Sequence, residues 1–332
     1  MKALVYTGTR QLDYRDAPLP TPRPGESLVR IEASGICGSD MHAWHGHDPR
    51  RVPPLILGHE LAGRVEGGAL DGRRVAVNPL IGCGACRDCL DARPNLCGKR
   101  DLLGLGRDGG YAEHVAVPTA NLMALDESLD AAEASLMEPL AVVLHALALA
   151  RDTLARPLAE CRALVIGGGA IGVLAALALS RRGVPELAVA ETSAARRETL
   201  ARIGAGEVFD PRGEAPPNDT FELVVDAVGS GPTRALSSRL VRRGGTIVHV
   251  GLQDGAEGLD TRRLTLSEIA FLGSYTYAPA DLRAALDTLT RGALGSLDWL
   301  ERRSLADGAR AFEDIDTGNA PPKIVLLPEL RP

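Results

Sequence analysis

Aromatic residues are scarce in this sequence, and basic residues do not outnumber acidic ones. Phe, Trp and Tyr together make up 3% of its 332 residues, which is too few for a surface that stacks nucleic-acid bases. Lysine and arginine number 37 against 43 aspartates and glutamates, so the formal net charge is −6. An acidic chain is a poor partner for phosphate backbones and anionic membranes. We therefore expect neither nucleic acid nor a membrane as a partner.

Long apolar segments are scarce as well. No apolar run approaches the ~20 residues that cross a bilayer, and residues 1–16 lack the apolar segment of a signal peptide. These absences predict a cytoplasmic protein, in which thiols stay reduced. The length of 332 residues favours two domains over one.

Cysteine is used sparingly, but four of the six cysteines lie close together. The pattern C-x2-C-x2-C-x7-C is made by Cys83, Cys86, Cys89 and Cys97. This spacing suits one tetrahedral zinc ion, and four thiolates leave no open coordination position, so the zinc would be structural. Unligated thiols are a weaker alternative, because four so close together are unusual in a reducing compartment. An iron–sulfur cluster is disfavoured because no proline follows the last cysteine.

A glycine-rich turn within residues 162–183 predicts a dinucleotide site. The apolar segment ALVI leads into the pattern G-x-G-x-x-G, and helical periodicity follows. A strand, this turn and a helix together bind a pyrophosphate at the helix N-terminus. An ordinary strand–helix turn is the weaker alternative. The predicted cofactor-binding residues of the turn are Gly167, Gly169, Ala170, Ile171 and Gly172.

Glu191 ends the next apolar segment, 19 residues after Gly172. A carboxylate at this place accepts hydrogen bonds from the adenosine ribose and repels a 2′-phosphate, so NAD is favoured over NADP. Arg196 and Arg197 follow shortly after and weaken this preference slightly; on a helix both could also be solvated charges.

Apolar segments continue to alternate with helical ones beyond this point. Strands are predicted at 206–210, 223–229, 245–251 and 270–277, with a helical segment such as 232–244 between some of them. This alternation is typical of an α/β fold with a doubly wound parallel sheet.

Several motifs, taken in order, resemble one enzyme family. They are G-I-C-G-S-D-x-H, G-H-E-x-x-G-x-V, the four-cysteine lobe, E-P-L-A-V and G-G-G-A-I-G. In this order they resemble the zinc-dependent medium-chain dehydrogenases, and most closely their polyol (sorbitol-type) branch. The resemblance covers nearly the whole chain.

The resemblance implies a GroES-like, β-rich catalytic domain and a Rossmann cofactor domain. The expected boundaries are 1–140 for the catalytic domain, with the structural zinc lobe at 82–98, and 141–275 for the cofactor domain. Residues 276–332 would return to the catalytic domain, because the stretch PPKIVLLPEL resembles its closing strand.

The same resemblance implies a second, catalytic zinc ion in each subunit. Cys37 and His59 match its ligands, and Glu60 and Glu138 are interchangeable candidates for the remaining one. Ser39 matches the hydroxyl that touches the substrate oxygen. His42 matches the end of a proton relay that runs from that serine through the nicotinamide ribose to solvent. The resemblance also implies that Arg196 binds the cofactor, beside its adenine.

The activity implied is the NAD-dependent oxidation of a secondary alcohol of the polyol, sugar-alcohol or sugar-acid type, by a homo-oligomer, either a dimer or a tetramer. Thr276 stands where sorbitol-type members have an arginine, which argues against sorbitol itself. Threonine 3-dehydrogenase and a simple secondary-alcohol dehydrogenase remain alternatives. A catalytically silent, zinc-binding structural or sensor relative is the alternative from another class.

Arg50 and Arg51 could meet an anionic substrate, but two arginines beside prolines more often form a solvated loop.

Overall fold

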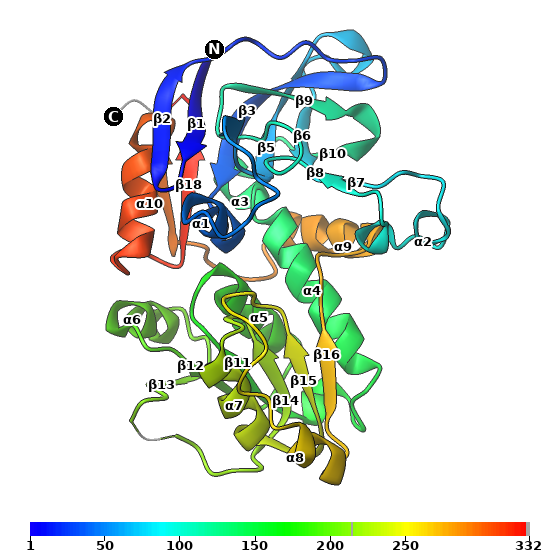
Figure 1. Ribbon diagram of the computed structural model, residues 1–332. Coiled ribbons are helices and arrows are strands. Elements are labelled where there is room, and N and C mark those ends of the chain that lie inside the picture. The colour runs from blue at the N-terminus through cyan, green and yellow to red at the C-terminus, as the bar shows by residue number, and fades with distance from the viewer. Residues whose placement is uncertain (214, 330–332) are drawn as a thin grey trace. The chain divides into compact units, whose positions relative to one another are not determined.

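The computed structural model describes residues 1–213 and 215–329, which form two compact units. Unit 1 comprises Met1–Glu138, Ala278–Gly292 and Leu300–Pro332, and unit 2 comprises Pro139–Tyr277 and Ala293–Trp299 (Figure 1). The second unit is thus inserted into the first. Its borders lie two residues from the expected 140/141 and 275/276, and residues 293–299 group with it as well.

Unit 2 is built on one six-stranded sheet whose strand order is β13-β12-β11-β14-β15-β16. All five neighbouring pairs in this sheet are parallel. The strands are β11 (Arg162–Ile166), β12 (Glu186–Ala190), β13 (Glu207–Phe209), β14 (Phe221–Asp226), β15 (Val241–His249) and β16 (Ala270–Gly273). Their apolar side chains, such as Leu164, Val224 and Ile247, are fully buried, as expected for a sheet covered on both faces.

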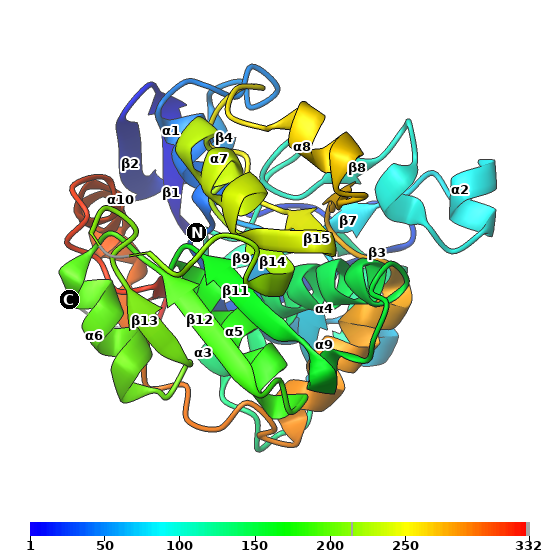
Figure 2. The same ribbon diagram turned by 90° about the horizontal axis from the view of Figure 1, so that it is seen from below.

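The order of these strands places their helices on opposite faces of the sheet. From β11 the chain moves outward one way through α5 (Ala170–Arg181) and α6 (Ala194–Arg202). From β14 it moves the other way through α7 (Gly231–Leu240) and α8 (Thr261–Leu266). Because both sets of crossovers are right-handed, α5 and α7 cover different faces (Figure 2). The first strands of the two halves, β11 and β14, lie side by side, and between them a doubly wound sheet binds its ligand.

The predicted elements of unit 2 differ from the observed ones in their limits. The strands expected at 206–210, 223–229 and 245–251 are Glu207–Phe209, Phe221–Asp226 and Val241–His249, and two further elements differ more clearly. The helical segment expected at 232–244 ends at Leu240, and Val241 already begins β15, which hydrogen-bonds to β14. The strand expected at 270–277 ends at Gly273. In both places tertiary pairing, rather than local propensity, decides where the element begins or ends.

Unit 1 consists mainly of antiparallel sheets. The largest has seven strands, six in the order β10-β6-β5-β3-β18-β17, with β9 paired to β3. A three-stranded sheet has the order β2-β1-β4, and β7 pairs with β8. The strands are β1 (Lys2–Gly8), β2 (Gln11–Asp16), β3 (Glu26–Gly35), β4 (Leu55–Ile56), β5 (Glu60–Glu66), β6 (Arg74–Val77), β7 (Leu80–Ile81), β8 (Asp101–Leu102), β9 (His114–Pro118), β10 (Leu122–Ala124), β17 (Leu300–Ser304) and β18 (Lys323–Leu327).

The C-terminal strand β18 joins the largest sheet of unit 1. It pairs antiparallel with β3, placing Val325 opposite Gly35. Ile324 and Leu326 are buried in the same core cluster as Leu4 and Trp44. The helices of this unit are α1 (Gly38–Trp44), α2 (Arg87–Leu90), α3 (Ala131–Ala134), α9 (Pro279–Thr290) and α10 (Gly308–Asp316).

Helix α4 (Met137–Arg151) begins in unit 1 and continues into unit 2. Together with α3 it forms a 21-residue segment, Ala131–Arg151, that is long and apolar enough to cross a membrane. The segment is not an uninterrupted apolar run, because it contains Glu133 and Glu138. Moreover, 72% of its apolar window is buried within the fold, as is typical of a core helix.

Candidate zinc and dinucleotide sites

The pairing of β3 with β5 brings the first candidate metal ligands together. The register places Gly35, the last residue of β3, opposite Glu60, the first residue of β5. Cys37 follows β3 and His59 precedes β5, so the same pairing carries their side chains toward Glu60. One ligand atom from each of Cys37, His59 and Glu60 lies within 4.8 Å of the other two. His59 and Glu60 are buried, at 4% and 1% exposure.

Asp40 lies next to His59 of this group. Its carboxylate is fully buried, accepts a hydrogen bond from the Tyr111 hydroxyl at 2.6 Å, and lies 3.5 Å from His59 Nδ1. Burial opposes the ionisation of Asp40, but the charges of His59 and Arg51 outweigh it and lower the pKa of this carboxyl. A carboxylate against one ring nitrogen is the usual support for a metal-ligating histidine.

The donor set fits a zinc ion. A thiol, an imidazole and a carboxylate are the three ligand types that zinc accepts in catalytic sites. Burial disfavours a charged His59, yet Asp40 and Cys37 raise the pKa of His59 well above its usual value. The negative charge around His59 therefore favours a bound cation. His59 Nδ1 and Asp40 Oδ1 are both buried without a hydrogen-bond partner, although they lie 3.5 Å apart. A metal bound to His59 would fix the orientation of its ring toward Asp40.

Lys323 is a residue of this site that the sequence did not suggest. It lies on β18, is 2% exposed, and donates to the Ile36 carbonyl at 2.8 Å while its ammonium contacts Glu60 Oε2. Gly35 makes room for this pair, because a Cβ there would stand 2.1 Å from Glu60 Oε2. No local signal marks Lys323, since only strand pairing brings it to Glu60.

The other carboxylate candidate, Glu138, lies in the first turn of α4 and is 5% exposed. It is not one of the three residues grouped around Cys37. The structure therefore brings Glu60, rather than Glu138, into the described ligand group.

The four-cysteine lobe forms a second candidate metal centre. One sulfur from each of Cys83, Cys86, Cys89 and Cys97 lies within 4.8 Å of the others. All are free thiols. Backbone N–H groups of Ala85 and Cys86 lower the pKa of the Cys83 thiol to about 6, which favours the thiolate that binds metal.

Gly82 is required beneath these sulfurs. A Cβ at this position would come within 3.0 Å of both Cys89 Sγ and Pro94 Cβ. Four convergent thiols suit a closed tetrahedral zinc site.

Ser39 and His42 both lie on α1, three residues apart and so on one helical face. Burial, together with the positive neighbours His47, His45 and Arg51, lowers the pKa of His42. The Ser39 hydroxyl accepts a hydrogen bond from Arg51 Nη2 at 3.2 Å.

The glycine-rich turn has the geometry that its pattern predicts. Gly167 has a φ of 101°, and a Cβ on Gly172 would stand 1.7 Å from the Gly167 carbonyl. Gly169 caps α5, so Ala170 and Ile171 are its first two residues. Their backbone N–H groups have no partner within the helix and are available to a phosphate.

Glu191 stands directly beside this turn. Its carboxylate accepts hydrogen bonds from Gly168 N at 2.6 Å and Ser193 N at 2.6 Å. Arg197 donates to the carbonyls of Glu191 and Thr192 and to Asp210, so it is tied to the backbone. The backbone N–H of Arg196 donates to Ser193 Oγ, and its buried Nε has no hydrogen-bond partner.

A cavity of about 560 Å³ opens next to Glu191 and lies wholly within unit 2. Its lining includes Gly167, Val228, Ser230, Thr192 and Arg212. Arg212 was not foreseen, because it follows β13 in a loop without a motif. It is paired with Asp210 at 2.7 Å.

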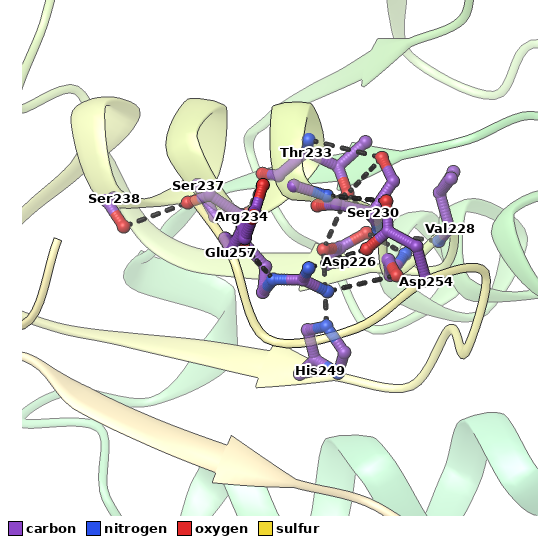
Figure 3. Close-up of polar contacts among 12 residues, drawn as sticks. Asp226, Val228, Ser230, Thr233, Arg234, Ser237, Ser238, His249, Asp254 and Glu257 are labelled. Carbon is purple, nitrogen blue, oxygen red and sulfur yellow. Dashed lines mark hydrogen bonds and ion pairs between the residues drawn. The ribbon is translucent and has the colours of Figure 1, made fainter. Parts of the chain in front are cut away.

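A polar network holds the turn after β14 that borders this cavity (Figure 3). Asp226, fully buried at the end of β14, accepts hydrogen bonds from Val228 N and Gly229 N. Arg234 on α7 donates to the Gly229 carbonyl, to the Glu257 carbonyl and to Asp254. This buried guanidinium therefore joins the turn to the segment after β15, which supplies Gln253 to the cavity.

Comparison with known proteins decides the family. Residues 23–127 match the alcohol dehydrogenase GroES-like domain, and residues 170–291 match the zinc-binding dehydrogenase domain. The L-galactonate-5-dehydrogenase of Escherichia coli K12 is 33% identical over 295 residues, 85% of each chain. The chain belongs to the zinc-dependent medium-chain dehydrogenases.

Other members are similar to this medium-chain dehydrogenase over almost their whole length. The L-threonine 3-dehydrogenase of Streptomyces coelicolor is 30% identical over 98% of this chain and 99% of its own. A zinc-binding dehydrogenase from Sinorhizobium meliloti 1021, solved bound to NADP, has a TM-score of 0.87 at 29% identity, covering 98% and 99% of the two chains. The expected combination of a GroES-like and a Rossmann domain is thereby confirmed.

Proposed function

We propose that this medium-chain dehydrogenase oxidises a secondary alcohol of the polyol, sugar-alcohol or sugar-acid type to a ketone, using zinc and NAD. The observation that carries the proposal is the grouping of half-buried Cys37 with buried His59 and Glu60, because a set of one thiol, one imidazole and one carboxylate suits a catalytic zinc. The relative named L-galactonate-5-dehydrogenase supports a sugar-acid substrate.

Two zinc ions per subunit follow from this proposal. Cys37 and His59 would hold the catalytic ion, with Glu60 or Glu138 as the remaining protein ligand. Glu60 is favoured by its place in the ligand group, although Lys323 competes for its carboxylate. The four clustered cysteines would hold the structural ion.

The dinucleotide would lie along the turn and cavity of unit 2. The first N–H groups of α5 would bind the pyrophosphate, Glu191 the adenosine ribose, and Arg196 would lie beside the adenine. NAD is favoured over NADP because a 2′-phosphate would meet the Glu191 carboxylate, and because Arg197 is engaged by Asp210 and backbone carbonyls.

When bound, zinc would stabilise the alkoxide form of the substrate hydroxyl and NAD would accept the hydride. The chain's own residues supply the proton path. Ser39 would accept the hydroxyl proton and pass on its own hydrogen. His42, kept neutral to a lower pH than an ordinary histidine, would receive the proton at the end of the relay and release it to solvent.

A second candidate is oxidation of threonine at its secondary hydroxyl. The 30% identity to a threonine 3-dehydrogenase over 98% of the chain favours it specifically. A simple secondary-alcohol dehydrogenase needs the same zinc chemistry. A catalytically silent relative would bind both zinc ions and reduce no coenzyme.

A substrate screen tests the proposal. Sugar acids, polyols, aldoses, threonine and simple secondary alcohols are each offered with NAD and with NADP, and reduced coenzyme is read by absorbance. We expect turnover of a sugar acid or polyol with NAD. Turnover of threonine alone would establish the second candidate. Preference for NADP would overturn the role of Glu191, and two bound zinc ions without turnover of any substrate would point to a silent relative.

The proposal includes a cytoplasmic homo-oligomer, a dimer or a tetramer. Light scattering of the purified protein measures its mass against the 34.9 kDa of one chain. A monomer would contradict this part of the proposal and leave the chemistry untouched.

A further inference from the structure

Arg51 is buried in unit 1, in the connection between α1 and β4. Its side chain is 2% exposed, whereas that of the neighbouring Arg50 is 62% exposed. The prediction that both arginines form a solvated loop is therefore wrong for Arg51. A buried arginine must be matched by acceptors and opposite charge, since leaving it unpaired is costly.

The acceptors around Arg51 engage most of its guanidinium. Nε donates to the Gly104 carbonyl at 2.9 Å. Nη1 donates to the Ser39 carbonyl at 3.0 Å and to Asp48 at 2.9 Å. Nη2 donates to the Ser39 hydroxyl at 3.2 Å and lies 3.7 Å from Asp40. An arginine has five N–H groups; four of them make these hydrogen bonds, and the remaining one lies nearest to Asp40, beyond hydrogen-bond distance.

Two of these contacts hold the same serine, at its carbonyl and at its hydroxyl. A serine hydroxyl has one hydrogen and two lone pairs, and it normally rotates among three staggered positions. A guanidinium can only donate, so it occupies one lone pair of the Ser39 oxygen and never accepts its hydrogen. The remaining lone pair and the hydrogen are then left for two other partners.

We propose that Arg51 is a positioning residue that orients the Ser39 hydroxyl for proton transfer. The inference rests on the proposed function, in which Ser39 receives the substrate proton. In that step the substrate O–H bond breaks and a new O–H bond forms on the free lone pair of Ser39. The original hydrogen of Ser39 leaves to the next acceptor of the relay, so one proton passes and the serine stays neutral.

A double-mutant cycle tests this inference on the full-length enzyme loaded with zinc. Arg51→Met, Ser39→Ala and the double variant are compared using the best substrate of the screen. We expect Arg51→Met to lower kcat about 10-fold, the effect of one charge-assisted hydrogen bond, with zinc content and the KM for NAD unchanged. In the Ser39→Ala background the same change should have no further effect, because the group on which Arg51 acts is gone.

Three further variants separate positioning from folding. Arg51→Lys keeps the charge but loses the planar fork, and we expect partial recovery of kcat. If Arg51→Met does not fold, Arg51→Met with Asp48→Asn removes both charges of the pair and takes its place in the cycle. Arg50→Met is the matched control, because Arg50 pairs with the same Asp48 from an exposed position; its kcat should be unchanged.

The outcomes distinguish this inference from the proposed function. Losses that multiply in the double variant would overturn the inference alone, since Arg51 would then act independently of Ser39. An unchanged kcat in Ser39→Ala would overturn the proposed relay and the inference with it.

Discussion

At the scale of single residues, charge and burial around His42 set the pH range of the proposed reaction. Burial and the nearby His47, His45 and Arg51 all disfavour its protonated form, and only Asp48 opposes them. A proton acceptor works only while neutral. A histidine with a lowered pKa therefore stays competent at a pH where an ordinary one, with a pKa near ~6.5, is already protonated.

We predict that alcohol oxidation is lost only as the pH falls below about 6.5, through the lowered pKa of His42. His42→Ala should lower kcat about 100-fold, as expected for loss of a general base, and should remove this acid limb. His47→Ala removes one of the causes of the shift, so it should move the limb to higher pH and leave the plateau unchanged. Profiles of kcat against pH check both variants; an acid limb that persists in His42→Ala would assign it to another group.

At the scale of elements, the turn after β14 depends on a segment distant in sequence. Arg234 donates one hydrogen bond to the Gly229 carbonyl at 3.0 Å and another to Asp254 at 2.6 Å. The residues that line the cavity here, Val228, Ser230 and Gln253, are therefore held by a side chain that does not line it. Such preorganisation reduces the ordering cost of binding.

We predict that Arg234→Met weakens NADH binding about 10-fold. The variant loses the charge-assisted hydrogen bonds that keep the loop ordered, and a 10-fold change corresponds to the free energy of roughly one such bond. The matched control is Arg263→Met. Arg263 also joins backbone carbonyls and an aspartate, at Ser238, Val241 and Asp219, but none of these lines the cavity. Fluorescence titration with NADH measures both. Equal weakening in the two variants would indicate general destabilisation of unit 2.

At the scale of the whole molecule, the two candidate metal centres have different surroundings. The Cys37 group lies where the long paired strands β3 and β5 meet at their ends, and it is bordered by Asp40, Tyr111 and Lys323. The cysteine lobe contains only short elements, such as the four-residue α2. A small lobe of this kind has little core of its own and relies on its metal for folding.

We predict two zinc equivalents per chain and unequal effects of removing them. Cys37→Ser should lose one equivalent and its activity while keeping its melting temperature nearly unchanged. Cys97→Ser should also lose one equivalent, but its melting temperature should fall by about 5 °C, the shift expected for ~2 kcal/mol in a domain of this size. Elemental analysis and calorimetry check both. A larger thermal effect from Cys37→Ser would reverse the proposed structural and catalytic assignments.

The sequence by itself determined the features that depend on neighbouring residues. The spacing of Cys83, Cys86, Cys89 and Cys97 is set within fifteen positions, so the lobe could be predicted without any tertiary information. The glycine turn is equally local, because a positive φ at Gly167 and the absence of a Cβ at Gly172 are properties of one strand–helix connection. The alternation of strands and helices likewise predicted the parallel sheet.

Only the tertiary structure decided what depends on strand register and burial. The pairing of β3 with β5 and β18 brought Glu60 and Lys323 together from positions 263 residues apart, whereas Glu138 stayed outside the ligand group. Arg51, which resembled a surface charge, proved buried, because its side chain is enclosed by contacts with Ser39, Asp48 and Gly104. The sequence gives the chemistry of each side chain. Which side chains meet depends on which backbone segments hydrogen-bond to each other.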